Sequence, residues 1–356
     1  MVTARGRAGA WGLGPLQPVA ELGGVTDVLV NGGERGPGGQ RVWFDRGAGL
    51  EAVEVPVEGE HELRALAVRL AASAGRRLDE SMPWVDARLP GGVRLHAVVP
   101  PVTPTGTHLS LRLLGGSRLD LAALVAAGSV PPSWAPVLTA LVVRRAAFLV
   151  TGGTGAGKTT LLAALLGLVD PGERIVLVED VGELRPVHPH VVRLEARHAN
   201  VEGRGAVTLE DLVRQALRMR PDRLVVGECR GGEVRDLLAA LNTGHAGGCG
   251  TLHANAAAEV PARLEALGSL AGLDQAAVHS QAAAALDAVV HVQRLPAGRR
   301  VTEIATVTGG GRAGLVVRPA LVARTEPDGP GGGRSAIGPG WAELARRLHL
   351  AEEGPQ

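Results

Sequence analysis

Apolar and polar positions alternate along the first third of the chain, which is typical of strands with one buried face. Short alternating runs at residues 27–32 and 41–47 flank a Gly-rich stretch and predict a β-hairpin. Two more strands are expected around a Pro-Gly-Gly turn between residues 84 and 99, and another at 108–114. Residues 61–74 instead repeat apolar side chains at helical spacing. The pattern predicts a small α+β domain with a mainly antiparallel sheet, at residues 16–127.

The pattern changes in the rest of the chain, where wholly apolar runs alternate with helical segments. This alternation predicts an α/β domain at residues 138–324, with a mostly parallel sheet and helices on its faces. Strands are expected at residues 148–151, 174–179, 191–194, 224–227 and 250–253, with a closing pair at 289–293 and 301–307.

Interruptions of these patterns predict the remaining boundaries. A short helix expected at residues 119–127 is followed by Gly128 and by Pro131-Pro132, so residues 128–137 are expected to be the interdomain linker. Residues 1–15 are rich in Gly, Ala and Arg and are expected to be flexible. The Gly- and Pro-rich tail at 325–356 is expected to be disordered, apart from a short helix beginning at Trp341.

A glycine-rich loop joins the first apolar strand of the second domain to the helix that follows. Four of its residues have the spacing of a phosphate-binding loop: Gly152, Gly157, Lys158 and Thr159. Glycines let backbone N–H groups turn inward around phosphates, and the helix N-terminus adds partial positive charge. Lys158 is expected to reach the β- and γ-phosphates of ATP, and the Thr159 hydroxyl to complete a Mg²⁺ shell. The expected nucleotide contacts are Gly152, Gly153, Thr154, Gly155, Ala156, Gly157, Lys158, Thr159 and Thr160.

Lys158 is the only lysine of the chain, since every other basic residue is arginine or histidine. A chain with 51 glycines contains Gly–Gly pairs by chance, so a glycine-rich turn is the alternative interpretation. However, the one lysine stands where a compact ammonium group suits phosphate, which argues against a chance match.

Composition narrows the class of protein. A hydrophobic content of 45% is that of a globular chain. A net charge of +1 and an aromatic content of 2% argue against a protein whose main task is to coat nucleic acid. No apolar run reaches about 20 residues, so no transmembrane helix is expected and any membrane contact is peripheral. The two cysteines, Cys229 and Cys249, are expected to be reduced and unpaired.

Acidic residues stand at the ends of two further apolar strands, where α/β sheets place their ligands. Glu179 and Asp180 follow one strand and are candidates for holding Mg²⁺ or orienting water, with a strand-ending acidic turn as the alternative. Glu228 ends the other strand, where a glutamate can polarise water for attack on the γ-phosphate. A solvated strand terminus is the alternative interpretation of Glu228.

Two histidines and several arginines complete the candidates. His245 and His253 bracket a Gly-rich turn and a strand, where they are expected to sense the γ-phosphate or to contact a neighbouring subunit. Zinc binding together with Cys249 is a less favoured alternative. Arginines stabilise phosphoryl-transfer charge, although most surface arginines are merely solvated. The candidates are Arg94, Arg112, Arg197, Arg204, Arg218, Arg220 and Arg230.

In order and spacing, these stretches resemble the motifs of the secretion ATPases of the type II/type IV secretion superfamily. The phosphate loop corresponds to that family's Walker A motif, and residues 178–184 to its aspartate box. Residues 217–228 resemble the atypical Walker B motif, and 243–255 the histidine box. The resemblance extends over about residues 20–310 and is nearest to the tight-adherence (Flp) pilus assembly branch.

The resemblance implies a RecA-like P-loop ATPase domain preceded by a smaller α+β domain, with ATP bound between them in a homohexameric ring. It implies a cytoplasmic ATPase at the inner face of the cell membrane. Such a motor drives pilin extraction or substrate export through an inner-membrane platform protein.

The resemblance also assigns roles to individual residues. It implies catalytic roles for Lys158, Glu179, Glu228, His253, Arg94 and Arg112, the two arginines completing the site from the N-terminal domain. Further nucleotide contacts are implied for Asp180, Glu183, His245 and Arg230. Mg²⁺ ligands, partly through water, are Thr159, Glu179 and Glu228.

Two alternative functions stay open. A DNA-conjugation ATPase is one, since relatives serve DNA transfer, although the balanced charge speaks against direct DNA handling. The other is a nucleotide-binding switch or assembly scaffold with little turnover.

Overall fold

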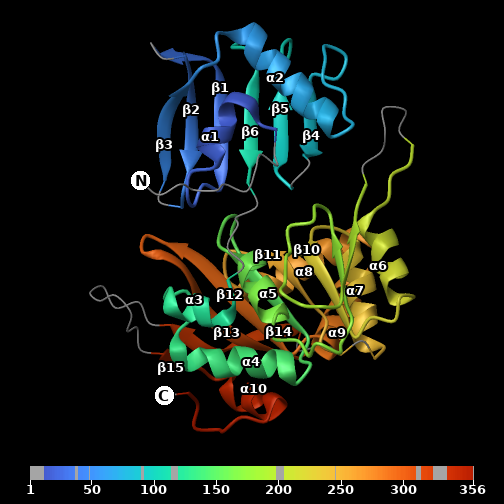
Figure 1. Ribbon diagram of the computed structural model, residues 1–356. Helices are drawn as coiled ribbons and strands as arrows, with labels where there is room; N and C mark the ends of the chain where they lie inside the picture. Colours follow the sequence, from blue (N-terminus) through green and yellow to red (C-terminus); the bar gives the residue numbers. More distant parts are fainter. Residues whose placement is uncertain are drawn as a thin grey trace. The chain divides into compact units, whose positions relative to one another are not determined.

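The computed structural model divides the chain into two compact units, Met1–Ser117 and Arg118–Gln356 (Figure 1). It describes residues 12–36, 39–47, 49–89, 92–113, 119–197, 204–244, 246–309, 314–323 and 335–355.

The first unit is a six-stranded antiparallel sheet with the order β3-β2-β1-β6-β5-β4 and a long helix, α2, packed against it (Figure 1). Alternate strand residues such as Val28 and Leu95 are buried together with Leu63 and Leu70 of α2, so a single face of the sheet makes the core. The α+β prediction is confirmed. The elements are η1 Gly14–Leu16, α1 Gln17–Ala20, β1 Asp27–Gly36, β2 Gly39–Asp45, β3 Leu50–Val55, α2 Glu60–Ser73, β4 Trp84–Arg88, β5 Arg94–Val98 and β6 His108–Arg112.

The second unit is built on a nine-stranded sheet with the order β15-β14-β13-β12-β7-β11-β10-β8-β9. The six strands from β12 to β9 are parallel, and β13, β14 and β15 continue the sheet in antiparallel pairs. The prediction of a mostly parallel sheet is therefore confirmed, and the expected closing pair is extended by two further strands. The strands are β7 Phe148–Gly152, β8 Ile175–Glu179, β9 Val191–Glu195, β10 Arg223–Cys229, β11 Cys249–His253, β12 Ala288–Leu295, β13 Gly298–Gly309, β14 Leu315–Ala323 and β15 Ser335–Ile337.

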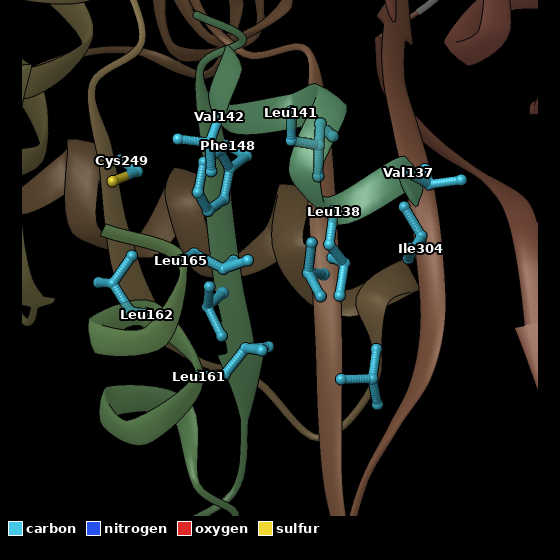
Figure 2. Close-up of a cluster of buried hydrophobic side chains, with 14 of the residues drawn as sticks. Val137, Leu138, Leu141, Val142, Phe148, Leu161, Leu162, Leu165, Cys249 and Ile304 are labelled. Atoms are coloured by element: carbon cyan, nitrogen blue, oxygen red, sulfur yellow. The ribbon is translucent and has the colours of Figure 1, made fainter. Parts of the chain in front are cut away.

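Helices cover both faces of this sheet, which is why its central strands are wholly buried (Figure 1). Phe148 and Val150 of β7 pack against α3, α4, α5 and α10, whereas Leu149 between them packs into the core beneath α6 to α9. Figure 2 shows the first of these cores, where Leu138 and Leu141 of α4 lie near Phe148 and Leu165. The helices are α3 Leu121–Ala126, η2 Pro132–Trp134, α4 Ala135–Val143, α5 Lys158–Leu166, α6 Leu209–Leu217, α7 Glu233–Asn242, η3 Ala257–Glu259, α8 Val260–Leu270, α9 Gln275–Ala285 and α10 Trp341–Leu348.

The structure corrects the predicted linker at residues 128–137. These residues form η2 and the beginning of α4, and Val130, Trp134 and Val137 are buried in the second unit. Pro132 and Pro136 stand in the first turns of these two helices, where a proline begins a helix instead of ending one. The units divide earlier, at Ser117.

The short helix expected at Trp341 is confirmed as α10, whereas the flexibility predicted for the rest of both ends is wrong where the structure describes them. Residues 1–11 lie outside the described part, but Leu13 is wholly buried in the first unit. Residues 325–334 also lie outside it, whereas β15 pairs with β14 and α10 buries Trp341 and Leu344. The apolar face of α10 supplies the burial that the Gly- and Pro-rich composition of the tail does not suggest.

Candidate functional site

Four neighbouring parallel strands end at the same edge of the large sheet and bring the predicted chemical residues together. Gly152 at the end of β7 is level with His253 at the end of β11. Val226 of β10 is level with Val178 of β8, so Glu228 and Glu179 follow at this same edge. Residues that are far apart in the sequence therefore lie at one edge of the sheet, the carboxyl end of its parallel strands, where α/β folds bind ligands.

The phosphate loop has a conformation that only glycine permits at several points. Gly155 and Gly157 have positive φ angles of 69° and 99°, and Gly157 is the N-cap of α5. A Cβ atom on Gly152 would lie 2.3 Å from the carbonyl oxygen of Val292, so the neighbouring strand β12 leaves no room for a side chain. Of the other loop residues, Ala156 is buried, Gly153 and Thr159 are half-buried, and Thr154 and Thr160 are exposed.

Lys158 lies under this loop and is 9% exposed as a residue. Its Nζ donates hydrogen bonds of 3.0 Å to the carbonyl oxygens of both Gly152 and Gly153. Burial lowers the pKa of Lys158, and the nearby carboxylate of Glu228 acts in the opposite direction. The ammonium group is thus held inside the loop and close to a carboxylate.

Glu179 is a buried carboxylate at the end of β8, with 3% of the residue exposed. Its Oε1 accepts the backbone N–H groups of Glu183 (2.8 Å) and Leu184 (2.9 Å). Its Oε2 is buried without a hydrogen-bond partner. Burial raises the pKa of Glu179, against the two backbone hydrogen bonds. A buried carboxylate oxygen without a partner is suited to a cation or an ordered water.

Glu179→Gln is expected to gain stability relative to the native protein as the pH rises: the difference between their free energies of unfolding should shift in favour of the variant. Because the raised pKa means that the folded state prefers the protonated carboxyl, the native protein loses stability above the ordinary carboxyl pKa, and glutamine does not. Urea unfolding from about pH 5 to about pH 8 measures the difference. The same substitution at the exposed Glu80 is the control. A difference that stays constant over this range would contradict the prediction.

Glu228 forms an ion pair with Arg230 two residues farther on. The Arg230 Nε donates to Glu228 Oε2 at 2.6 Å, and Arg230 Nη1 lies 3.5 Å from Asp180 Oδ2. Arg230 therefore links the carboxylates that follow β10 and β8. The buried Glu233 accepts the backbone N–H groups of Arg230 and Gly231, which shapes this turn.

The two predicted histidines have different outcomes. His253 lies half-buried at the end of β11, level with the phosphate loop, and its carbonyl oxygen accepts from Arg263 Nε at 3.0 Å. His245 lies outside the described residues. The γ-phosphate sensing that we expect of both histidines stays a prediction.

His291 is a site residue that the sequence analysis missed. It is 2% exposed in β12, and its Nδ1 is hydrogen-bonded to Thr151 Oγ1 at 2.9 Å, directly before the phosphate loop. Burial lowers the pKa of His291, while a hydrogen bond to the backbone of Asn255 opposes this. The sequence does contain a signal that could have identified it, because His291 is a polar residue inside the apolar run Val289-Val290-His291-Val292.

Arg94 and Arg112 lie directly opposite each other on β5 and β6 of the first unit. Each is paired with an aspartate: Arg94 donates to Asp86 at 2.6 and 3.0 Å, and Arg112 to Asp27 at 3.1 Å. The two arginines belong to a different unit from the phosphate loop. Their expected contact with phosphates therefore stays a prediction.

The remaining chemical groups are less reactive than their residue types suggest. Cys229 and Cys249 are free and buried, and burial raises the pKa of both thiols, that of Cys249 to about 12. Among the described residues, no group of three or more His, Cys, Asp or Glu side chains is arranged to hold a metal ion. Within the same part of the chain, no helix has the length and apolar character needed to span a membrane.

Comparison with known proteins shows close relatives. Residues 25–304 match the family model described as type II/IV secretion system protein. A putative conjugal transfer protein of Mycobacterium tuberculosis is 58% identical over 303 residues, which cover 83% of this chain and 84% of that protein. The type IV secretion system protein PtlH of Bordetella pertussis is 37% identical over 267 residues, covering 68% and 76%.

Solved structures share the fold. The pilus retraction motor PilT with bound ADP has a TM-score of 0.58 at 22% identity, over 95% of this chain and 86% of that one. The ATPase DotB of Legionella pneumophila has a TM-score of 0.56 at 20% identity, over 86% and 79%. These likenesses confirm the predicted fold class. Because the family model covers most of the chain, this chain belongs to the type II/IV secretion system protein family.

Proposed function

We propose that this chain is the ATP-hydrolysing motor of a secretion or pilus assembly machine. The observation that carries the proposal is the grouping of the buried Lys158 ammonium with the carboxylates of Glu179 and Glu228 at one edge of the sheet. A phosphate loop alone binds nucleotide, whereas turnover also needs groups that orient and deprotonate water. Family membership supports this assignment.

The residues at this edge suit Mg²⁺ as well as nucleotide. Glu179 Oε2 is a buried carboxylate oxygen without a protein partner, and hard cations prefer such oxygens. In the proposal, Thr159, Glu179 and Glu228 hold the ion, partly through water. When bound, Mg²⁺ neutralises charge on the β- and γ-phosphates.

Each protein group then has a separate task. The N–H groups of the loop and the buried Lys158 ammonium hold the phosphates, because both are hydrogen-bond donors at the same loop. Glu228 takes the proton from the attacking water, with its orientation maintained by Arg230. Asp180 and Glu183 support this arrangement, and His253 with His245 reports whether the γ-phosphate is present.

The motor is proposed to act as a homohexameric ring in which Arg94 and Arg112 of the first unit complete the ATP site. In the proposal, Arg94 and Arg112, which lie opposite each other on adjacent strands, exchange their aspartate partners for phosphate oxygens. In this proposal the ring lies in the cytoplasm against the inner face of the membrane and drives an inner-membrane platform protein. Pilin extraction by a tight-adherence (Flp) system is the cargo we favour.

Conjugal DNA transfer is a second candidate, favoured by the name of the Mycobacterium tuberculosis relative. The chain carries 37 basic and 36 acidic side chains, so it lacks the basic excess typical of direct DNA binding. A conjugation motor that acts on a protein partner is consistent with this charge. Salt-dependent binding of DNA by the purified protein would favour direct handling instead.

Phosphate release by the purified protein, measured against protein concentration, tests the proposed function. The mass of the species in solution is measured in parallel, with and without ATP. Activity per chain that rises steeply as a hexamer forms is the expected result, because the site would be completed by assembly. Constant activity from a monomer would contradict the ring, and tight ATP binding without turnover would favour the switch or scaffold.

A further inference from the structure

The β12–β13 hairpin touches the phosphate loop at successive points along its length. His291 of β12 bonds Thr151 just before the loop, and the carbonyl of Val292 lies against Gly152. At the far end of the hairpin, Arg299 of β13 reaches the tip of the loop. These contacts join two segments more than a hundred residues apart in sequence.

Arg299 makes the contact with the loop tip. Its Nε donates to the carbonyl oxygen of Gly155 at 2.8 Å. Its aliphatic part lies beside Gly157, where a Cβ atom would be 3.1 Å from Arg299 Cδ. The side chain thus holds the loop by a charged hydrogen bond and by close packing on a glycine with a positive φ angle.

The Gly155 carbonyl matters because of how a phosphate loop works. When peptide N–H groups turn inward to receive phosphates, their carbonyl groups turn outward and need other partners. Arg299 supplies such a partner for the exposed Gly155. A hydrogen bond from a charged donor is stronger than one from a neutral donor, so it favours the binding-competent shape of the loop.

The charge arrangement at the hairpin also points to the loop. Arg299 is level with Arg294 on the paired strand, and like charges directly opposite each other destabilise a hairpin. A Cβ atom on Gly155 would lie 3.9 Å from Arg294 Nη1, so both guanidinium groups are near the loop tip. A cationic hairpin end beside a polyphosphate site is favourable once nucleotide is bound.

We propose that Arg299 is a positioning residue of the nucleotide site, which holds the phosphate loop in its binding-competent shape through the Gly155 carbonyl. It acts through the loop and takes no part in the reaction. Its loss therefore weakens ATP binding and leaves the chemical step unchanged. This inference rests on the proposed ATPase function.

Steady-state ATP hydrolysis and nucleotide binding by the assembled protein test the proposal. Arg299→Ala is expected to raise KM and the Kd for ATP about five- to thirtyfold, with kcat changed less than about twofold. Arg299→Lys should recover part of the affinity, because lysine keeps the aliphatic stem and a charged donor. The control is Arg346→Ala, which removes an arginine that is paired with Glu343 on α10.

The outcomes separate this inference from the proposed function. Native KM in Arg299→Ala would overturn it, and so would a fall in kcat at unchanged KM. The inference would also be overturned if Arg299→Ala lost affinity and unfolded at a lower midpoint than Arg346→Ala. The lost affinity would then reflect damage to the fold. If the native protein and Arg346→Ala bind ATP without turnover, the motor is contradicted, while the Kd comparison still tests Arg299.

Discussion

Replacing Lys158 with alanine is expected to lower ATP hydrolysis by at least about 10²-fold. Lys158 is the only lysine of the chain, and its ammonium group lies buried within the loop, bonded to the carbonyls of Gly152 and Gly153. No other side chain on the loop carries a positive charge, so alanine leaves the phosphates without a buried cation. Phosphate release by the purified variant at saturating ATP is the measurement.

Lys158→Arg serves as the matched variant, because it keeps the charge but replaces a compact ammonium with a larger planar group. We expect it to be almost as impaired, since 9% exposure of Lys158 leaves little space. Unfolding midpoints close to that of the native protein would show that both variants fold. Native turnover in Lys158→Ala would remove the assignment of the site.

Replacing Glu228 with glutamine is expected to slow hydrolysis by about 10²-fold or more while ATP binding persists. Glutamine has nearly the same shape and can accept the hydrogen bond from Arg230, but it cannot take a proton from water. Binding of ATP and the rate of a single turnover, measured on the same preparation, separate the two effects.

Glu51→Gln is the control for Glu228→Gln, because Glu51 is also an arginine-paired carboxylate but lies on β3 of the first unit. It should leave both binding and turnover at native values. Loss of ATP binding in Glu228→Gln would assign Glu228 a structural role through Arg230 and Asp180. The candidate base would then be Glu179, because burial raises the pKa of its carboxyl.

The phosphate loop was predictable from the sequence because its geometry is local. A buried strand, glycines that allow positive φ angles and a helix beginning at Lys158 are consecutive in the chain. The positions of Glu179 and Glu228 were predictable for a related reason. Each ends an apolar strand, and parallel strands end at a common edge.

Errors in the sequence analysis came from judging composition where packing decides. Pro131-Pro132 suggested a linker and the Gly- and Pro-rich tail suggested disorder before the helix at Trp341, yet Trp134 is buried and β15 pairs with β14. Both segments are rich in Pro or Gly, but burial of apolar side chains offsets the entropy of ordering their neighbours. Burial of an apolar side chain depends on packing partners from other parts of the chain, which the composition of its own segment does not reveal.

The sequence by itself determined the phosphate-loop pattern, the class of fold and the carboxylates at the ends of two apolar strands, because each follows from the order of residues within single strands, helices and their connections. The tertiary structure alone decided what surrounds them. It placed Arg230 between Glu228 and Asp180, His291 against Thr151, and Arg299 on the loop tip. These contacts join segments far apart in the chain, and strand order and register, which no local pattern specifies, bring them within hydrogen-bonding distance.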